Sequence, residues 1–317
     1  MRADPSSLKI LPRYRNLFTR RIASPFTSVV GSTSPPMLMN SDFFSKIPKE
    51  KKSGVGKTKY YTIICSKVKK NITEDVERCL KTYNPDQEPE CFVQAYYQRM
   101  QTNPNLDYDN LLNVCMDFFL AGMETTTTTL RWGTLILAEH IDIQEKIREE
   151  IFSVLGADGR PSTSLRNRLP YTNAAIQEIQ RYANIIPLNV IHRTVKDTSV
   201  ESIPIPGDTL VIGHIQHVMA HSPVYKDANE FRPERFLMED GITPNKEAVE
   251  QLCPFSVGKR QCAGEGLAKV ELFIGLITLL QNYKIEPVKG RQVDLEPIFA
   301  SVLLPKQQPL RLTPVTV

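Results

Sequence analysis

The longest apolar segment of the sequence extends over residues 107–140 and predicts one long helix. At 1.5 Å per residue, such a helix would span roughly 50 Å, about the full width of a domain. Its apolar run is interrupted by Asp117, Glu124 and Arg131. Because these charged residues break the run, the sequence predicts no membrane-spanning helix here.

The sequence before this helix divides into two parts. Residues 1–45 are rich in proline and serine, lack sustained periodicity and are expected to be irregular. Residues 58–101 favour helical segments, which the Asn84-Pro85 and Glu88-Pro89 dipeptides separate.

Three further helices are predicted after the long one, over residues 142–156, 172–184 and 264–283. In the first of them, Asp142 is expected to be the N-cap, Glu145 to complete a capping box and Gly156 to end the helix. Strand-like sequence lies at residues 188–194 and 209–215, with a turn at Pro206-Gly207 between them. The expected fold class is therefore mainly α with small β-sheets.

The composition narrows the class of protein. The 317 residues are 41% hydrophobic and 23% charged, as in a soluble globular protein, and the net charge of +4 is too small to indicate nucleic-acid binding. The six cysteines (65, 79, 91, 115, 253 and 262) show no C-x-x-C spacing, which favours a reducing intracellular environment over a disulfide framework. The first forty residues carry five arginines and one acid, a composition that leaves a mitochondrial transit peptide as an alternative.

Two apparent motifs are weak. The stretch S-G-V-G-K-T at residues 53–58 resembles the end of a phosphate-binding loop, but Lys51 stands where the pattern needs glycine and no strand precedes it, so a solvated basic loop is expected. His214, His217 and His221 have a spacing that could suit zinc on a helix. The sequence around them is strand-like and supplies no carboxylate or cysteine at ligand spacing, so packing or surface roles are favoured.

The stretch P-F-S-V-G-K-R-Q-C-A-G-E-G at residues 254–266 is different in kind. Its fixed positions follow the spacing F-x-x-G-x-R-x-C-x-G, which chance rarely produces: Phe255, Gly258, Arg260, Cys262 and Gly264. The glycines let backbone amides turn toward the sulfur, and the helix that follows places its positive end beside it, so both favour a thiolate. A single thiolate beside Arg260 suits a metal that is held largely by an anionic macrocycle, such as haem.

Three more motifs stand in order along the chain. They are A-G-x-E-T-T at Ala121, Gly122, Glu124, Thr125 and Thr126, E-x-x-R at Glu178 and Arg181, and P-E-R-F at residues 233–236. With the cysteine loop, they make the sequence similar to the cytochrome P450 family of haem-thiolate monooxygenases. The stretches around residues 188–194 and 221–231 resemble the animal microsomal, drug-metabolising branch.

The resemblance implies a role for each matching residue. Cys262 would be the proximal ligand of haem b, and Glu124 and Thr125 would relay protons to bound oxygen. The five threonines at 125–129 are also poor helix formers, so a bend at Ala121-Gly122 is expected. The resemblance also implies a buried network that braces the cysteine loop, formed by Glu178, Arg181 and Arg235. It further implies contacts with the haem propionates from His192, Arg193 and Arg260.

The resemblance also has limits. We expect residues 46–317 to form a partial domain that covers the C-terminal two thirds of the family's fold, without its membrane anchor or its W-x-x-x-R propionate contact. The only tryptophan, Trp132, lies in the long helix. The family's I-P-K-G-T turn is changed at Gly207-Asp208, a difference that a turn should tolerate.

The implied function is insertion of one atom of O₂ into a lipophilic substrate of the xenobiotic, fatty acid or steroid class, in xenobiotic or organic acid metabolism. Electrons would come from NADPH through a reductase that docks near Lys259. The implied location is the endoplasmic reticulum membrane, and the cytoplasm for the chain as given. Two alternatives stay open at this point: a non-catalytic fragment that does not hold haem, and a zinc protein that uses the three histidines.

Overall fold

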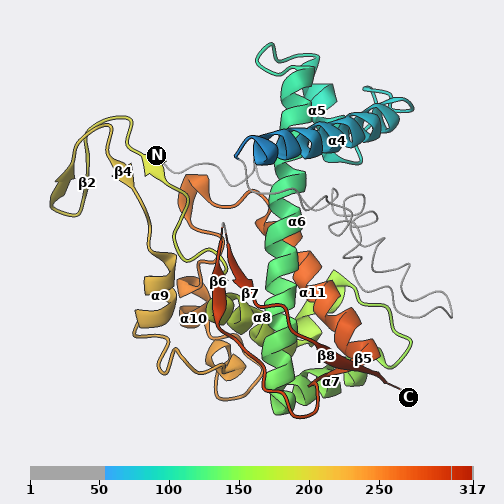
Figure 1. Ribbon diagram of the computed structural model, residues 1–317, viewed down its shortest axis with the longest axis vertical. Coiled ribbons are helices and arrows are strands. Elements are labelled where there is room, and N and C mark those ends of the chain that lie inside the picture. The colour runs from blue at the N-terminus through green and yellow to red at the C-terminus, as the bar shows by residue number, and fades with distance from the viewer. Residues whose placement is uncertain (1–53, 301, 316–317) are drawn as a thin grey trace. The chain divides into compact units, whose positions relative to one another are not determined.

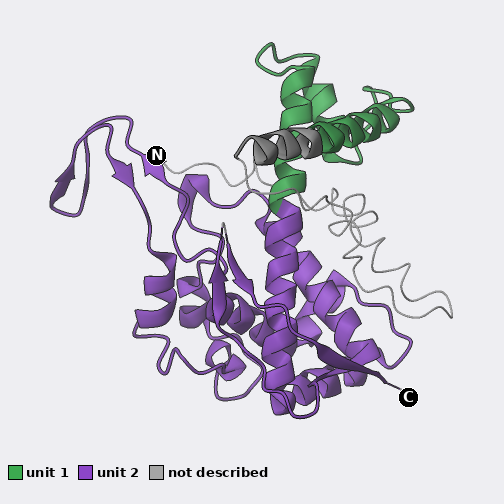
Figure 2. Ribbon diagram, in the orientation of Figure 1, with its two compact units in different colours: residues 1–121 green, residues 122–317 purple. Residues whose placement is uncertain are grey.

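The structure is a computed structural model that describes residues 54–300 and 302–315, with side chains from residue 66 onward (Figure 1). The predicted irregular segment at residues 1–45 lies outside the described residues. The chain divides into two compact units, residues 1–121 and residues 122–317 (Figure 2). The division falls within the long helix α6, Tyr108–Glu139, whose bounds agree with the prediction to within one residue.

The first unit contains α4, Gly54–Leu80, α5, Phe92–Met100, and the start of α6. The two predicted proline dipeptides lie in the connection between α4 and α5, as expected. A small core of Val76, Leu111, Leu112 and Cys115 joins the helices. The basic stretch at residues 54–58, predicted as a loop, forms the first turn of α4 instead, because the helix-favouring sequence that follows extends back through it.

The core of the second unit is formed by the end of α6, α7 (Ile141–Leu155), α8 (Pro170–Ala183) and α11 (Glu265–Asn282). Gly156 ends α7 with φ 68°, as predicted. The predicted capping box is wrong: His140 is the N-cap and no side chain caps the helix. The break between α6 and α7 is a single residue, so Asp142 already lies inside the first turn.

Four two-stranded antiparallel sheets complete the described part of this unit. The pairs are β1 (His192–Arg193) with β4 (Leu210–Val211), β2 (Thr198–Val200) with β3 (Ile203–Ile205), β5 (Tyr283–Pro287) with β8 (Leu310–Pro314), and β6 (Pro297–Phe299) with β7 (Leu303–Pro305). The predicted strands at 188–194 and 209–215 are shortened to β1 and β4, and the β2–β3 hairpin between them was not predicted. The fold class, mainly α with small β-sheets, is confirmed.

Short helices connect these parts. They are η2 (Thr163–Arg168), α9 (Ile215–His221), η3 (Pro233–Phe236), α10 (Lys246–Gln251) and η4 (Gly258–Arg260). Because α9 begins at Ile215, the end of the second predicted strand is helical. No helix in the described ranges is long and apolar enough to cross a membrane.

Candidate functional site

The segment between α10 and α11 folds back on itself and presents Cys262. The amide of Cys262 donates to the carbonyl of Phe255 at 2.9 Å and closes the loop. The turn contains two residues with positive φ, Ser256 at 62° and Gly258 at 82°. Glycine adopts this conformation without steric cost, whereas serine is strained there. Backbone geometry therefore accounts for glycine at position 258 of the motif.

The thiol of Cys262 is exposed just before the N-terminus of α11, where Gly264 is the N-cap. The positive end of the helix dipole thus lies near the sulfur. The predicted amide donors to the sulfur are not found among the described residues. The amides of Gln261, Cys262 and Glu265 donate instead to backbone carbonyls.

Two cations precede the cysteine in sequence. Lys259 and Arg260 are both exposed, and within the described ranges neither has an ion-pair partner. On the other side of the loop, the ammonium group of Lys269 lies 5.7 Å from the ring centroid of Phe255 and pairs with Glu265 at 2.6 Å. Lys259 and Arg260 are therefore the cations of this loop that remain available to an anionic ligand.

An apolar surface borders the cysteine loop. The side-chain amide of Asn189 donates to the Ser256 hydroxyl at 2.9 Å and ties residues 188–191 to the loop. Val190 is 73% exposed and Val257 is 72% exposed, and Leu188 and Ile191 are exposed beside them. Exposed apolar side chains on the loop that carries the thiol, and on the segment tied to it, suit a flat apolar ligand, and the cations that precede Cys262 suit its acidic edges. The residues present therefore fit haem.

The predicted propionate contacts differ from each other. His192 and Arg193 form β1 and are both exposed. Arg193 forms an ion pair with Asp208. Asp208 has φ 67°, a conformation that glycine adopts more readily, and stands within the changed Gly207-Asp208 turn. The changed turn thus places a carboxylate on Arg193. In the described part of the chain, Arg260 and His192 have no ion-pair partner.

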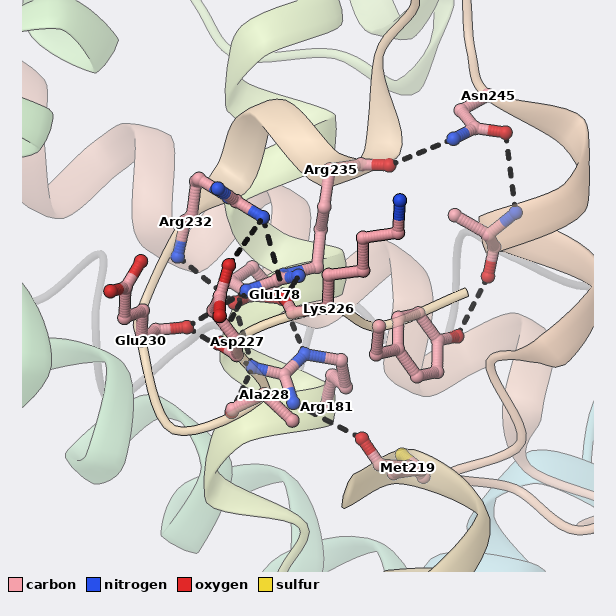
Figure 3. A network of polar contacts seen from close by, with 12 residues as sticks. Glu178, Arg181, Met219, Lys226, Asp227, Ala228, Glu230, Arg232, Arg235 and Asn245 are labelled. Atoms are coloured by element: carbon pink, nitrogen blue, oxygen red, sulfur yellow. Dashed lines mark hydrogen bonds and ion pairs between the residues drawn. The ribbon is translucent and has the colours of Figure 1, made fainter. Parts of the chain in front are cut away.

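The structure brings Glu178, Arg181 and Arg235 together in one buried cluster (Figure 3). Arg181 donates to both carboxylate oxygens of Glu178, from Nε at 2.7 Å and from a terminal nitrogen at 2.8 Å. Arg235 Nε donates to the same carboxylate at 3.0 Å. The three residues are 0%, 2% and 7% exposed, so the E-x-x-R pair is not the solvated surface pair that its spacing alone would suggest.

This cluster is joined to the helix that leads into the cysteine loop. The Arg181 guanidinium lies 5.5 Å from the ring centroid of Tyr225, whose hydroxyl donates to the carbonyl of Ala248 in α10 at 2.7 Å. Asn245 donates to the carbonyl of Arg235 at 3.1 Å and caps α10 through the amide of Ala248. Sequence reasoning missed Tyr225 and Asn245, although asparagine before K-E-A-V is a recognisable N-cap signal.

The oxygen-motif residues lie on α6. Glu124 is exposed and Thr125 is half-buried. Thr128 donates to the Glu124 carboxylate at 3.5 Å, and the Thr129 hydroxyl donates to the carbonyl of Thr125 at 3.0 Å, so threonine hydroxyls compete for acceptors as predicted. The helix nonetheless continues without a break through Ala121-Gly122.

Glu271 of α11 is a further titratable group that sequence reasoning missed. Burial raises the pKa of its carboxyl group, and the hydroxyl of Thr126 offsets part of this effect. One carboxylate oxygen is buried and has no hydrogen-bond partner among the described residues. An unpaired buried oxygen of this kind favours the protonated acid.

The three histidines do not form a metal site. The rings of His217 and His221 stack at a centroid distance of 4.6 Å on α9. Within the described ranges, no group of three histidine, cysteine, aspartate or glutamate side chains could hold a metal ion. The packing or surface role that the sequence favours is thus consistent with the structure.

Known structures share this fold. A zebrafish protein described as "Zebra fish cytochrome P450 another structure with Progesterone" superposes with a TM-score of 0.71 at 28% identity. The match covers 78% of this chain and 58% of that one. The fold is therefore shared, over most of this chain, with a solved cytochrome P450.

Sequence comparison identifies the family. The Cytochrome P450 family profile matches residues 31–312, and the chain belongs to this family. Chicken cytochrome P450 2H1 is 39% identical over 218 residues, and rabbit cytochrome P450 2E1 is 37% identical over 244 residues. These matches cover 68% and 73% of this chain but 44% and 49% of the relatives. The predicted resemblance to the animal branch is confirmed, and the chain spans less than half the length of these curated relatives.

Proposed function

We propose that this protein is a haem-thiolate monooxygenase that inserts one oxygen atom of O₂ into a lipophilic organic substrate. The observation that carries the proposal is the exposed thiol of Cys262, which lies between the exposed cation Arg260 and the N-terminus of α11. Apolar side chains border the same loop. Family membership supports the same reaction class.

In this proposal Cys262 binds the haem iron as a thiolate. The helix dipole of α11 and the positive potential of Lys259 and Arg260 favour the anionic sulfur. Arg260 would neutralise a haem propionate and His192 would donate a hydrogen bond to one, and Arg193 could join them only after it leaves Asp208. Haem with a thiolate ligand supplies the chemistry of O–O bond cleavage.

Phe255, Gly258 and Gly264 give the loop its shape. Phe255 accepts the closing hydrogen bond from Cys262, and Gly258 takes the positive φ of the turn. Glu178, Arg181 and Arg235 hold α10 in place through Tyr225 and Asn245, so their role is structural (Figure 3).

Glu124 and Thr125 handle protons in this proposal. Both lie on α6, and Glu124 is exposed to solvent, so its carboxylate can exchange protons with water. Thr125 is the next residue and is half-buried. This position suits a hydroxyl that passes a proton from the solvent side toward a bound molecule.

The finer assignments follow from the family. The relatives named above are animal cytochromes P450. This similarity supports a supply of electrons from NADPH through a reductase and a substrate of the xenobiotic, fatty acid or steroid class. It also supports the endoplasmic reticulum membrane as the location. The exposed ammonium group of Lys259 offers the reductase a complementary charge near the cysteine.

The test is the carbon monoxide difference spectrum of the reduced protein reconstituted with haem. The wild type should give the thiolate-type band, and Cys262→Ser should lose it because a hydroxyl is a much weaker anionic donor. Cys253→Ser, which changes a half-buried cysteine at the start of the same loop, is the matched control and should keep the band. A wild type that takes up no haem would support the non-catalytic alternative, and a thiolate band in Cys262→Ser would refute the ligand assignment.

A further inference from the structure

Two cysteines far from the haem motif lie side by side in the first unit. The sulfur of Cys79, in the last turn of α4, is 3.4 Å from the sulfur of Cys91, which is the N-cap of α5. Eleven residues separate them in sequence, and both thiols are free. A disulfide has an S–S bond of about 2.05 Å, so the two sulfurs need to approach by only about 1.4 Å.

The environment makes the pair chemically unequal. Cys91 is 5% exposed, whereas Cys79 is only partly buried. A hydrogen bond from Cys79 lowers the pKa of the Cys91 thiol. The backbone amides of Val93 and Gln94, in the first turn of α5, lower it further, although the Cys91 side chain forms no capping hydrogen bond. The same hydrogen bond raises the pKa of Cys79.

We propose that Cys79 and Cys91 form a peroxide-sensitive dithiol that closes reversibly to a disulfide. In the first step the Cys91 thiolate attacks hydrogen peroxide, the O–O bond breaks, and a sulfenic acid and hydroxide form. In the second step the Cys79 thiol attacks the Cys91 sulfur and displaces its oxygen. The displaced oxygen takes the proton from Cys79 and leaves as water, and the hydroxide of the first step takes up the proton that Cys91 lost when it formed the thiolate, so that two molecules of water result. The two thiols lose two electrons, and peroxide gains them.

The unequal thiols suit this sequence of steps. The nucleophile is the thiolate, and Cys91 is the member of the pair whose thiol pKa is lowered. Cys79 stays protonated and close enough to resolve the sulfenic acid before further oxidation. Cys115 lies in the same small core, where burial raises the pKa of its thiol to about 11, so it is a poor competitor for peroxide.

The disulfide would tie the end of α4 to the start of α5. The connection between these helices is otherwise held by polar contacts such as the hydrogen bond from Gln98 to the carbonyl of Pro85 at 2.6 Å. Closing the pair would therefore fix the helical hairpin covalently, and a reductant would release it. The proposal does not depend on haem binding, because every residue in it lies in the first unit.

The test uses the full chain, treated with hydrogen peroxide, blocked with an alkylating agent, digested and analysed by mass spectrometry. We expect a linked Cys79–Cys91 peptide that disappears after reduction and forms roughly ten-fold faster in the native protein than in urea. Cys79→Ser and Cys91→Ser should each lose the link, whereas Cys253→Ser should keep it. Two results would overturn the proposal. In one, both thiols of the native protein stay alkylatable while the exposed Cys262 is oxidised. In the other, Cys91 links to Cys115.

Discussion

Arg181 and Glu178 form a two-pronged ion pair at 2.7 and 2.8 Å inside the second unit, with neither side chain more than 2% exposed. Removing one member would leave the other as an uncompensated buried charge. We expect Arg181→Ala to lower the free energy of unfolding by about 3–5 kcal/mol, as measured by urea denaturation.

The matched control for this variant is Arg311→Ala, which breaks the exposed pair with Glu286 in the same unit. It should cost about 1 kcal/mol or less. Equal losses for the two variants would mean that burial of the Glu178 cluster contributes nothing.

Tyr225→Phe tests the link from that cluster to the cysteine loop. The variant keeps the ring under Arg181 but loses the hydroxyl that donates to Ala248. We expect a loss of about 1 kcal/mol in stability and a faster loss of haem to an apo-protein acceptor. Tyr97→Phe, in the first unit, should change neither quantity. An unchanged rate of haem loss in Tyr225→Phe would show that α10 does not transmit the effect.

Asp208→Asn tests whether the carboxylate restrains Arg193. Asparagine tolerates positive φ, so the variant removes the charge while the turn is kept. The freed guanidinium should raise haem affinity about two- to five-fold, the effect of an exposed ion pair. The same substitution in an Arg193→Ala background should have no effect, and a gain there would assign the change to the turn rather than to Arg193.

Thr125→Ala should retain haem and substrate but divert electrons to hydrogen peroxide. The reason is loss of the hydroxyl that passes protons in the proposed relay. The measurement compares product formed with NADPH consumed in a reconstituted system. Thr127→Ala, two residues further along on another face of α6, is the control. Equal coupling in the two variants would remove Thr125 from the relay.

Glu271 predicts a dependence of stability on pH. Because burial raises the pKa of this carboxyl group, folding favours the protonated acid. The contribution of Glu271 to the stability of the folded protein is therefore complete below the ordinary carboxyl pKa, and it is lost as the pH rises through the raised pKa. Glu271→Gln should therefore be more stable than the wild type by about 1 kcal/mol at neutral pH and equal to it near pH 4. Glu247→Gln, at an exposed position, is the matched control.

The sequence predicted what is encoded locally. The apolar runs of α6 and α11 and the positive φ at Gly156 are properties of a few neighbouring residues, and so is the glycine turn before Cys262. Tyr225 was missed because its contacts join residues far apart in the chain, whereas the N-cap at Asn245 is a local signal that the sequence pattern could have predicted. The predicted capping box at Asp142 is wrong because the break after α6 is a single residue, so that α7 begins before Asp142.

The two buried arginines also determine the shape of a loop that has little apolar content of its own. Arg235 donates to the carbonyls of Lys226, Asp227 and Glu230, and Arg181 to those of Ala228 and Glu230. Residues 226–230 therefore wrap around two guanidinium groups much as a calcium-binding loop wraps around its ion, with backbone oxygens as ligands. Since any residue supplies such an oxygen, side chains in this loop should be free to vary among homologues while the two arginines stay fixed.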